Sequence, residues 1–569
     1  MTPDRSALGP AQRARDVERL ANEQFDLLVI GGGVTGTGIA LDAAVRGLNV
    51  ALVEQRDYSS GTSSRSSKLF HGGLRYLEQL NFRLVREALR ERNLMLKTIC
   101  PHLAEGIPFL YPLKHRIWER VYVGAGIALY DFLATISRSP LPHHRHMTKT
   151  GALEAMPALD PGVLVGAIQY WDALVDDARH TMMVARTAAA HGAALVPSAK
   201  VVGLTTDSGR VTGAEVADLE AGSPITVRAR QTVNATGVWT DDVEDLVKQG
   251  PINVTASKGI HMVIPKDRIS SSTGVITRTK TSVLFIIPWG EFWLIGTTDT
   301  DWNLDLAHPA ASRSDLDYLL ANANAVLEDD LSHEDVVGVY AGLRPLLTGE
   351  TDATSKLSRE HAVAGTAPGM ISIAGGKYTT YRVMAKDAVD VAIEEASLDA
   401  PASTTESVPL VGAAGYQQLL DQADQIVAES GLDRDRVVRM LRRYGDRISE
   451  VLALVGANAA LGEPLPGAER HIGAEIVYAA SHEGALHLDD VLTRRTRISI
   501  ETPHRGVEVA EQVAHIMGGV LGWSDAVISR EVEHYLARVN AELDSQRQPD
   551  DRTADAARLG APDVRGFSG

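Results

Sequence analysis

The chain has 569 residues, of which 44% are hydrophobic, and its 56 basic and 73 acidic residues give a formal net charge of −17. The length predicts roughly three to four domains, the composition is that of an ordinary globular protein, and the negative balance argues against a nucleic-acid binder. A single cysteine, Cys100, excludes a disulfide framework or a cysteine-based metal site within one chain, and we expect it to be a small buried side chain.

The N-terminal segment is polar and of mixed charge over residues 1–24, so we expect an extension without a signal peptide. The longest apolar run, residues 121–133, contains Asp131 and is too short to cross a bilayer. We therefore expect an intracellular protein, and any membrane contact must be peripheral.

A glycine-rich turn follows the first predicted strand, residues 25–29. Gly31 permits the tight turn, Gly33 lets the backbone approach a pyrophosphate, and Gly36 lets the following helix pack on the strand. The next predicted strand ends at Glu54, where a carboxylate is placed to accept hydrogen bonds from a ribose. Strand, glycines, helix and acidic residue in this order predict a bound dinucleotide.

The remaining chain alternates predicted helices, strands and glycine turns. In chain order these are a helix over 84–100, an insertion over 101–180, a helix over 180–191, short strands over 195–235 that end before Gly237, antiparallel strands over 253–300, a strand–glycine junction over 371–377 and a helix over 380–395. From 416 the pattern is almost entirely helical.

These patterns divide the chain into five parts. We expect an N-terminal extension over 1–24, a discontinuous nucleotide-binding domain over 25–400 with an inserted substrate-binding domain (about 101–180 and 253–345), a linker over 401–415, a helical C-terminal domain over 416–545 and a disordered polar tail over 546–569.

Further motifs follow the glycine turn in a fixed order. They cover residues 66–77, 257–261, 296–299, 342–346, 358–361 and 375–382. With the extended glycine segment, 30–47, they resemble the FAD-dependent glycerol-3-phosphate dehydrogenases of the respiratory, membrane-associated type. The resemblance runs from about residue 25 to 543. It implies an α/β fold, with a Rossmann-like doubly wound FAD domain, an antiparallel-sheet substrate domain and an α-helical C-terminal cap.

The resemblance also implies an activity. We expect oxidation of sn-glycerol 3-phosphate to dihydroxyacetone phosphate, with hydride transfer from C2 to FAD and electron transfer to a membrane quinone. The protein would be a homodimer in the cytoplasm, peripheral on the inner face of the cytoplasmic membrane. Three alternatives stay open: an oxidase that uses O2, an amine or amino-acid oxidase of related fold, and a non-catalytic flavoprotein.

Site residues follow from the matching motifs. Arginine suits a phosphate because its planar guanidinium makes paired, charge-assisted bonds, and a histidine that titrates near neutrality suits proton abstraction. His261 is the expected general base, with His71 as competitor, and Arg344 is expected to act beside it. The expected substrate ligands are Arg75, Tyr76, Arg344, Arg359 and Lys377. The expected cofactor ligands are Gly31, Gly33, Gly36, Glu54, Ser66, Ser67, His71, Gly237, Gly376, Lys377 and Thr379. Residues 482–487 lack the spacing of a helical zinc site, so we expect no metal.

Overall fold

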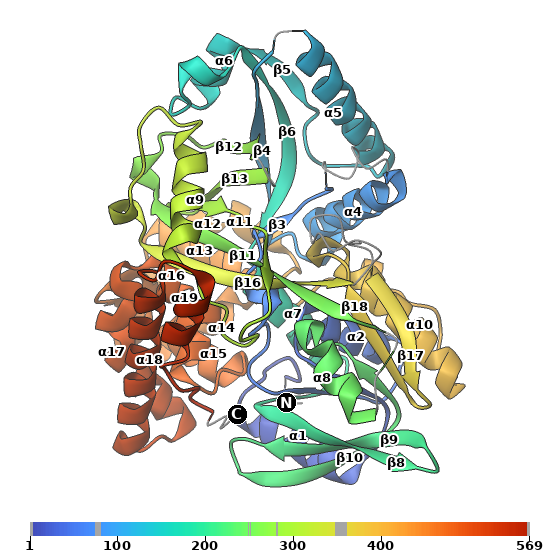
Figure 1. The fold of residues 1–569 in the computed structure, drawn as a ribbon. Coiled ribbons are helices and arrows are strands. Elements are labelled where there is room, and N and C mark those ends of the chain that lie inside the picture. The colour runs from blue at the N-terminus through green and yellow to red at the C-terminus, as the bar shows by residue number, and fades with distance from the viewer. Residues whose placement is uncertain are drawn as a thin grey trace.

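The structure is a computed structural model that describes residues 4–73, 81–115, 117–247, 250, 252–279, 283–347 and 361–565. Two β-sheets and a helical C-terminal region make up most of it (Figure 1). The first sheet lies in the lower half of Figure 1, the second rises above it, and the C-terminal helices pack beside both.

The first sheet carries the glycine-rich turn. Its strands and covering helices are β1 (Gln24–Ile30), β2 (Val50–Glu54), β7 (Ala194–Pro197), β10 (Ser223–Asn234), β17 (His361–Ala367), β18 (Met370–Gly375), α2 (Val34–Val45), α7 (Asp177–Ala190) and α10 (Tyr381–Ala396). The strand order is β17-β18-β10-β1-β2-β7, parallel except at the β17 edge. Strands covered on both faces read as continuous apolar runs, which is why β1 and β2 are so apolar in sequence.

The two faces of this sheet are covered differently. One core joins β1 and β2 to α2, α7 and α10. The other joins them to α1 (Pro10–Asn22) and to the antiparallel pair β8 (Ala199–Asp207) and β9 (Arg210–Asp218). The β-α-β order predicted from the sequence is confirmed, and so is the α/β fold class.

The second sheet combines two distant stretches of chain. Its strands are β3 (Leu69–Phe70), β4 (Ala104–Leu113), β5 (Arg145–Thr148), β6 (Gly166–Val175), β11 (Val254–Pro265), β12 (Gly274–Arg278), β13 (Val283–Trp289), β14 (Phe292–Gly296), β15 (Thr300–Trp302) and β16 (Gly338–Leu347). The two stretches join where β12 runs parallel to β4, and the other pairings are antiparallel. α6 (Lys149–Ala155) and α9 (Arg313–Asn324) cover one face, and α4 (Phe82–Leu94) and α5 (Trp118–Ile136) cover the other.

Helices dominate the C-terminal region, as predicted. They are α11 (Tyr416–Asp421), α12 (Ala423–Ser430), α13 (Arg434–Tyr444), α14 (Ile448–Ala457), α15 (Gly473–His482), α16 (Ile498–Glu501), α17 (Val507–Leu521) and α18 (Asp525–Ser545), with a hairpin of β19 (Pro464–Leu465) and β20 (Ala468–Ile472). Buried ion pairs attach the region to the first sheet: Asp57, just after β2, contacts Arg494 and Arg495. No helix in the described ranges has both the length and the apolar composition to cross a bilayer. Cys100 is buried, as expected.

The prediction of a disordered tail is wrong. The segment contains α19 (Asp551–Arg558), and residues up to 565 pack on the rest of the protein. Asp551 contacts the buried Lys258 at 2.5 Å, Asp563 contacts Arg56, and Arg565 contacts Asp490. Composition indicated disorder because the segment is polar, but its charges are matched by distant partners that a local pattern does not reveal.

Candidate active site

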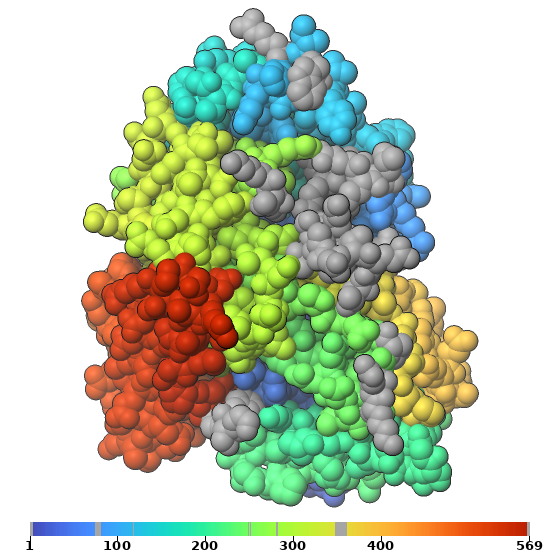
Figure 2. All heavy atoms as spheres, viewed as in Figure 1, coloured from blue at the N-terminus to red at the C-terminus, as the bar shows by residue number. Residues whose placement is uncertain are grey.

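A cavity of about 1320 Å³ lies where the carboxyl ends of β1, β2, β10 and β18 face β11 and β16 of the second sheet. Pockets for small molecules are typically about 300–1,000 Å³, so this one has room for a dinucleotide and a small substrate. In Figure 2 the surface is hollowed between the red C-terminal atoms and the green atoms of the first sheet, and blue atoms of the N-terminal part are visible inside.

The glycine-rich turn forms one end of the cavity. Gly31 has a φ of +110°, and a Cβ there would lie 2.7 Å from the carbonyl oxygen of Ala235. A Cβ on Gly33 would meet the Ser63 hydroxyl at 3.2 Å, and one on Gly36 would lie 1.9 Å from the carbonyl oxygen of Gly31. Gly31 and Gly33 line the cavity at the N-terminus of α2, where the positive end of the helix dipole favours phosphate. Gly36 packs against the turn and does not itself line the cavity.

Glu54 holds this turn in place from the end of β2. Its buried carboxylate accepts hydrogen bonds from the N–H of Gly32 at 2.6 Å and of Arg56 at 2.8 Å. Burial raises the pKa of Glu54. The side chain also lines the cavity, so one carboxylate both braces the glycine-rich turn and faces the space beside it.

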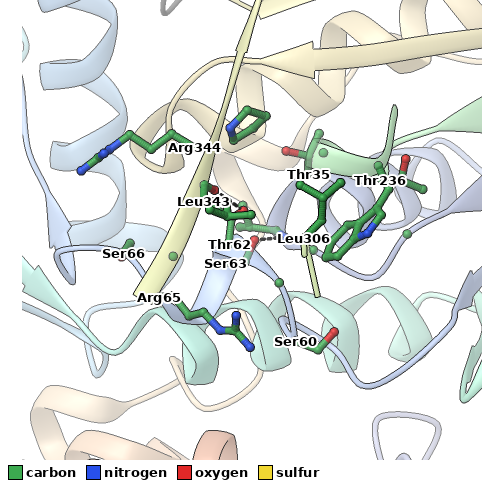
Figure 3. Close-up of a pocket in the computed structure, with 18 of the residues that line it drawn as sticks. Thr35, Ser60, Thr62, Ser63, Arg65, Ser66, Thr236, Leu306, Leu343 and Arg344 are labelled. Carbon is green, nitrogen blue, oxygen red and sulfur yellow. Dashed lines mark hydrogen bonds between the residues drawn. The ribbon is translucent and has the colours of Figure 1, made fainter. Parts of the chain in front are cut away.

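The loop after β2 connects the turn to the second sheet. The Ser63 hydroxyl accepts from the Val34 N–H at 2.9 Å, and the Thr62 hydroxyl donates to the carbonyl oxygen of Leu343 in β16 at 2.6 Å (Figure 3). The glycine-rich turn and the wall that carries Arg344 are therefore joined through two consecutive residues of one loop, Thr62 and Ser63.

His261 lies on β11 in the opposite wall. Its Nε2 is 2.9 Å from the Ser67 hydroxyl, and its ring stacks on Tyr340 with centroids 5.0 Å apart. Gly296 on the neighbouring strand leaves room for the ring, since a Cβ there would lie 2.2 Å from it. Burial, and then the charges of Arg344 and Lys68, hold the pKa of His261 well below its usual range. The imidazole is therefore neutral near pH 7.

Arg344, whose side chain extends from β16 in Figure 3, lines the same cavity as His261. One guanidinium nitrogen donates to the Thr297 hydroxyl at 3.0 Å, and the other lies 3.4 Å from the buried carboxylate of Asp299. Gly259 leaves space for this group, because a Cβ would lie 2.4 Å from it. The guanidinium is thus fixed by its neighbours while its side chain stays about one quarter exposed to the cavity.

Most of the other expected site residues also reach this cavity. Ser66, Ser67, His71, Gly237, Gly376 and Lys377 line it. Thr379 does not: it is buried behind the wall, and its hydroxyl accepts from the His71 N–H at 3.2 Å. Arg75, Tyr76 and Arg359 lie outside the described residues. Within the described ranges, no group of three or more His, Cys, Asp or Glu side chains could hold a metal ion.

The sequence reasoning missed a buried charge network beneath the site. The ammonium of Lys68 contacts Asp177 at 2.8 Å and lies 4.7 Å from the Tyr340 ring. Asp177 also accepts from the N–H and hydroxyl of Ser66, and it contacts Arg497 of the C-terminal region. Lys68 lies in the motif of residues 66–77 and Arg497 in the helical C-terminal region, and only the fold brings them together.

Comparisons with known proteins agree with this geometry. A family profile described as FAD dependent oxidoreductase matches residues 26–382, and one described as the C-terminal domain of alpha-glycerophosphate oxidase matches 403–528. Glycerol-3-phosphate dehydrogenase 2 of Mycobacterium tuberculosis is 57% identical over 561 residues, which covers 98% of this chain and 96% of that protein. The mitochondrial glycerol-3-phosphate dehydrogenase of Homo sapiens is 36% identical over 547 residues, or 92% and 74% of the two chains.

A solved structure is also similar. The glycerol-3-phosphate dehydrogenase from Bacillus halodurans complexed with FAD matches with a TM-score of 0.77 and 29% identity, over 94% of this chain and 98% of that one.

Proposed function

Since this chain belongs to the FAD-dependent glycerol-3-phosphate dehydrogenase family, we propose that it oxidises the C2 hydroxyl of sn-glycerol 3-phosphate to the ketone of dihydroxyacetone phosphate. The cofactor is FAD. The observation that carries the proposal is one continuous cavity, with a glycine phosphate turn at one end and His261, Arg344 and Lys377 in its walls.

The cofactor end fits FAD. Gly31 and Gly33 line the space at the N-terminus of α2 with bare backbone, and Glu54 lines the same space. These three residues would hold the pyrophosphate and the adenosine ribose. When bound, FAD supplies an acceptor for the two electrons that leave the substrate carbon as a hydride.

The substrate end fits a phosphate ester. Arg344 is oriented by Thr297 and Asp299, and Lys377 lines the same cavity. Guanidinium and ammonium groups together favour a phosphate dianion. By the family resemblance, Arg75, Tyr76 and Arg359 would complete the set.

His261 is the proposed base. A hydride can leave C2 only as the hydroxyl loses its proton, so a proton acceptor must stand beside the hydroxyl. The lowered pKa keeps the imidazole neutral and able to accept it. Ser67 and Tyr340 fix the ring, so its orientation does not depend on the substrate.

Anaerobic addition of glycerol 3-phosphate to the purified holoenzyme tests this function. We expect loss of the oxidised-flavin absorbance with glycerol 3-phosphate and negligible loss with glycerol. A flavin that stays oxidised would reject the proposal, and equal reduction by both compounds would reject the phosphate site.

The proposed electron acceptor is a membrane quinone, and the exposed face of α5 supports membrane contact. Val121, Ala125, Ala128, Phe132 and Ile136 follow each other at helical spacing and are exposed, with 67% of Val121 and 61% of Phe132 accessible. An apolar stripe facing solvent is typical of a helix that lies in a membrane interface.

Flotation with phosphatidylglycerol vesicles tests this face. Phe132→Asp should abolish co-flotation, whereas Ala457→Asp at the exposed end of α14 should have no effect. Equal flotation of parent and Phe132→Asp would exclude α5 as the contact.

An oxidase that uses O2 is the second candidate, favoured by the match of residues 403–528 to a domain described from an alpha-glycerophosphate oxidase. The two activities differ in the fate of the electrons. Turnover with a quinone analogue under anaerobic conditions supports the dehydrogenase, and stoichiometric peroxide release in air supports the oxidase.

A further inference from the structure

The C-terminal segment beyond α19 takes part in the cavity that the first sheet opens. Leu559, Ala561, Pro562 and Asp563 line it, although they lie about 500 residues along the chain from the glycine turn that forms its other end. The polar composition of the segment predicts disorder, so its ordered position requires specific contacts.

Ion pairs at the edge of the first sheet supply those contacts. Asp563 lies 3.0 Å from the guanidinium of Arg56 and 3.3 Å from the ring of His308. Two residues further on, the buried Arg565 contacts Asp490 at 2.9 Å. The segment is therefore held by ion pairs to residues from separate parts of the chain, of which Arg56 and His308 also line the cavity.

The ion pair between Asp563 and Arg56 shows which end of the cavity the C-terminal segment occupies. Arg56 follows Glu54 by two residues at the carboxyl end of β2, where the acidic residue of a dinucleotide fold meets the adenosine ribose. The C-terminal segment thus lies at the adenosine end of the cavity, away from His261 on β11.

Three exposed apolar side chains line this cavity. Val202 on β8 is 54% exposed, Leu246 in the turn after α8 (Thr240–Glu244) is 44% exposed, and Leu559 is 51% exposed. All three line the cavity although they come from separate parts of the chain. Large apolar side chains that gather at one opening mark a surface that a ligand covers.

We propose that residues 559–565 form one wall of the adenosine end of the FAD site, where Leu559 shares with Val202 and Leu246 an apolar rim for the adenine ring. The inference rests on the FAD-dependent function proposed above. A flat aromatic base removes the apolar rim from water, and the Asp563–Arg56 pair holds the wall in position. The C-terminal segment is then part of the cofactor site and slows the release of FAD.

The rate of FAD release from the holoenzyme tests the proposal. FAD-loaded protein is mixed with a large excess of an FAD-binding apoprotein, and transfer is followed by flavin fluorescence. Leu559→Ser should release FAD about fivefold faster, since it removes roughly half of a leucine's apolar contact. A chain ending at Arg558 should release FAD at least about tenfold faster, because it also lacks the ion pairs.

Phe82→Ser is the matched control. Phe82 is 44% exposed, close to the 51% of Leu559, but it begins α4 and does not line the cavity. It should release FAD at the parental rate. Near-ultraviolet circular dichroism of each FAD-saturated variant checks that the fold is retained.

Parental release from Leu559→Ser would overturn the proposal, whatever the shortened chain does. Failure of the proposed function is a separate result: the parent would then retain FAD but show no reduction by glycerol 3-phosphate. The release rates keep their meaning in that case, because they involve no substrate.

Discussion

Replacing Arg344 by alanine should remove the main contact of the protein with the substrate phosphate and leave the site for FAD intact. Arg344 lies on β16, and its guanidinium is held by the Thr297 hydroxyl at 3.0 Å and the Thr298 carbonyl at 3.2 Å. Both threonines lie between β14 and β15 of the second sheet, so the truncation leaves the glycine-rich turn and Glu54 of the first sheet unchanged.

The magnitude has two sources. Loss of a forked, charge-assisted pair to a phosphate costs roughly 2–4 kcal/mol, which corresponds to about 30- to 1,000-fold in kcat/KM. The second source is Asp299, whose buried carboxylate lies 3.4 Å from the guanidinium and would face the phosphate after the truncation. Adding Asp299→Asn to Arg344→Ala should therefore recover activity by roughly tenfold, because it removes a like charge.

Anaerobic stopped-flow measurement of flavin reduction gives the effect directly. The apparent dissociation constant and the limiting reduction rate are obtained by varying glycerol 3-phosphate, and glycerol at high concentration serves as the substrate without phosphate. Arg344→Ala should lower the specificity constant for glycerol 3-phosphate and leave that for glycerol nearly unchanged. Arg344→Lys keeps the charge and loses the forked geometry. Its specificity constant for glycerol 3-phosphate should lie between those of the parent and of Arg344→Ala.

The reasoning is refuted if Arg344→Ala slows reduction by glycerol 3-phosphate and by glycerol by the same factor. That result would mean that Arg344 acts on the reacting carbon or on the flavin environment. If Asp299→Asn recovers no activity in the Arg344→Ala background, the Asp299 carboxylate does not repel the substrate phosphate after the truncation.

Other predictions concern the cofactor and two histidines. Gly33→Val should abolish FAD retention, measured as the flavin-to-protein ratio, and normal flavin content would exclude this turn as the phosphate site. Because the pKa of His261 is lowered, its neutral form persists as pH falls; flavin reduction should stay level down to about pH 6.5 and decline only below it. His261→Ala should remove that decline and most of the rate, and a parental rate across pH would place the base elsewhere. Burial opposes the charge of His487, yet hydrogen bonds to Glu220 and Glu531 raise its pKa to about 9. The protonated His487 therefore stabilises the folded protein by at most about 3 kcal/mol. This contribution is fully present below pH 6.5 and is lost as pH rises toward 9. The melting temperature should therefore fall over this range in the parent more than in His487→Gln, and equal slopes would contradict the assignment.

Local physical chemistry determined the first β-α-β unit. The turn at Gly31 requires a positive φ, and Gly36 lies so close to the carbonyl oxygen of Gly31 that no side chain fits. Such constraints act between residues a few positions apart, so they are visible as a spacing of glycines. The parallel strands are buried on both faces, and this too is visible as continuous apolar runs.

Sequence motifs also indicated most residues of the cavity wall, but not the contacts that orient their side chains. His261 and Arg344 were expected at the site and lie in one wall. Their orientation depends on Ser67, Tyr340 and Asp299, which come from other strands and loops. No spacing in the sequence encodes a contact between side chains from elements paired only in the folded sheet.

The tail shows most clearly what only the tertiary structure decided. By sequence, residues 546–569 are polar and give no reason to fold, because the apolar burial that compensates ordering entropy is small. In the structure, Asp563 meets Arg56 across 507 positions and Arg565 meets Asp490 across 75. The sequence alone thus determined the nucleotide turn, the fold class and the helical cap, since these depend on periodicity and on near neighbours. The joining of two distant stretches into one sheet and the closing of the cavity by the C-terminal segment depend on long-range pairs of charges and strands, which exist only once the chain has folded.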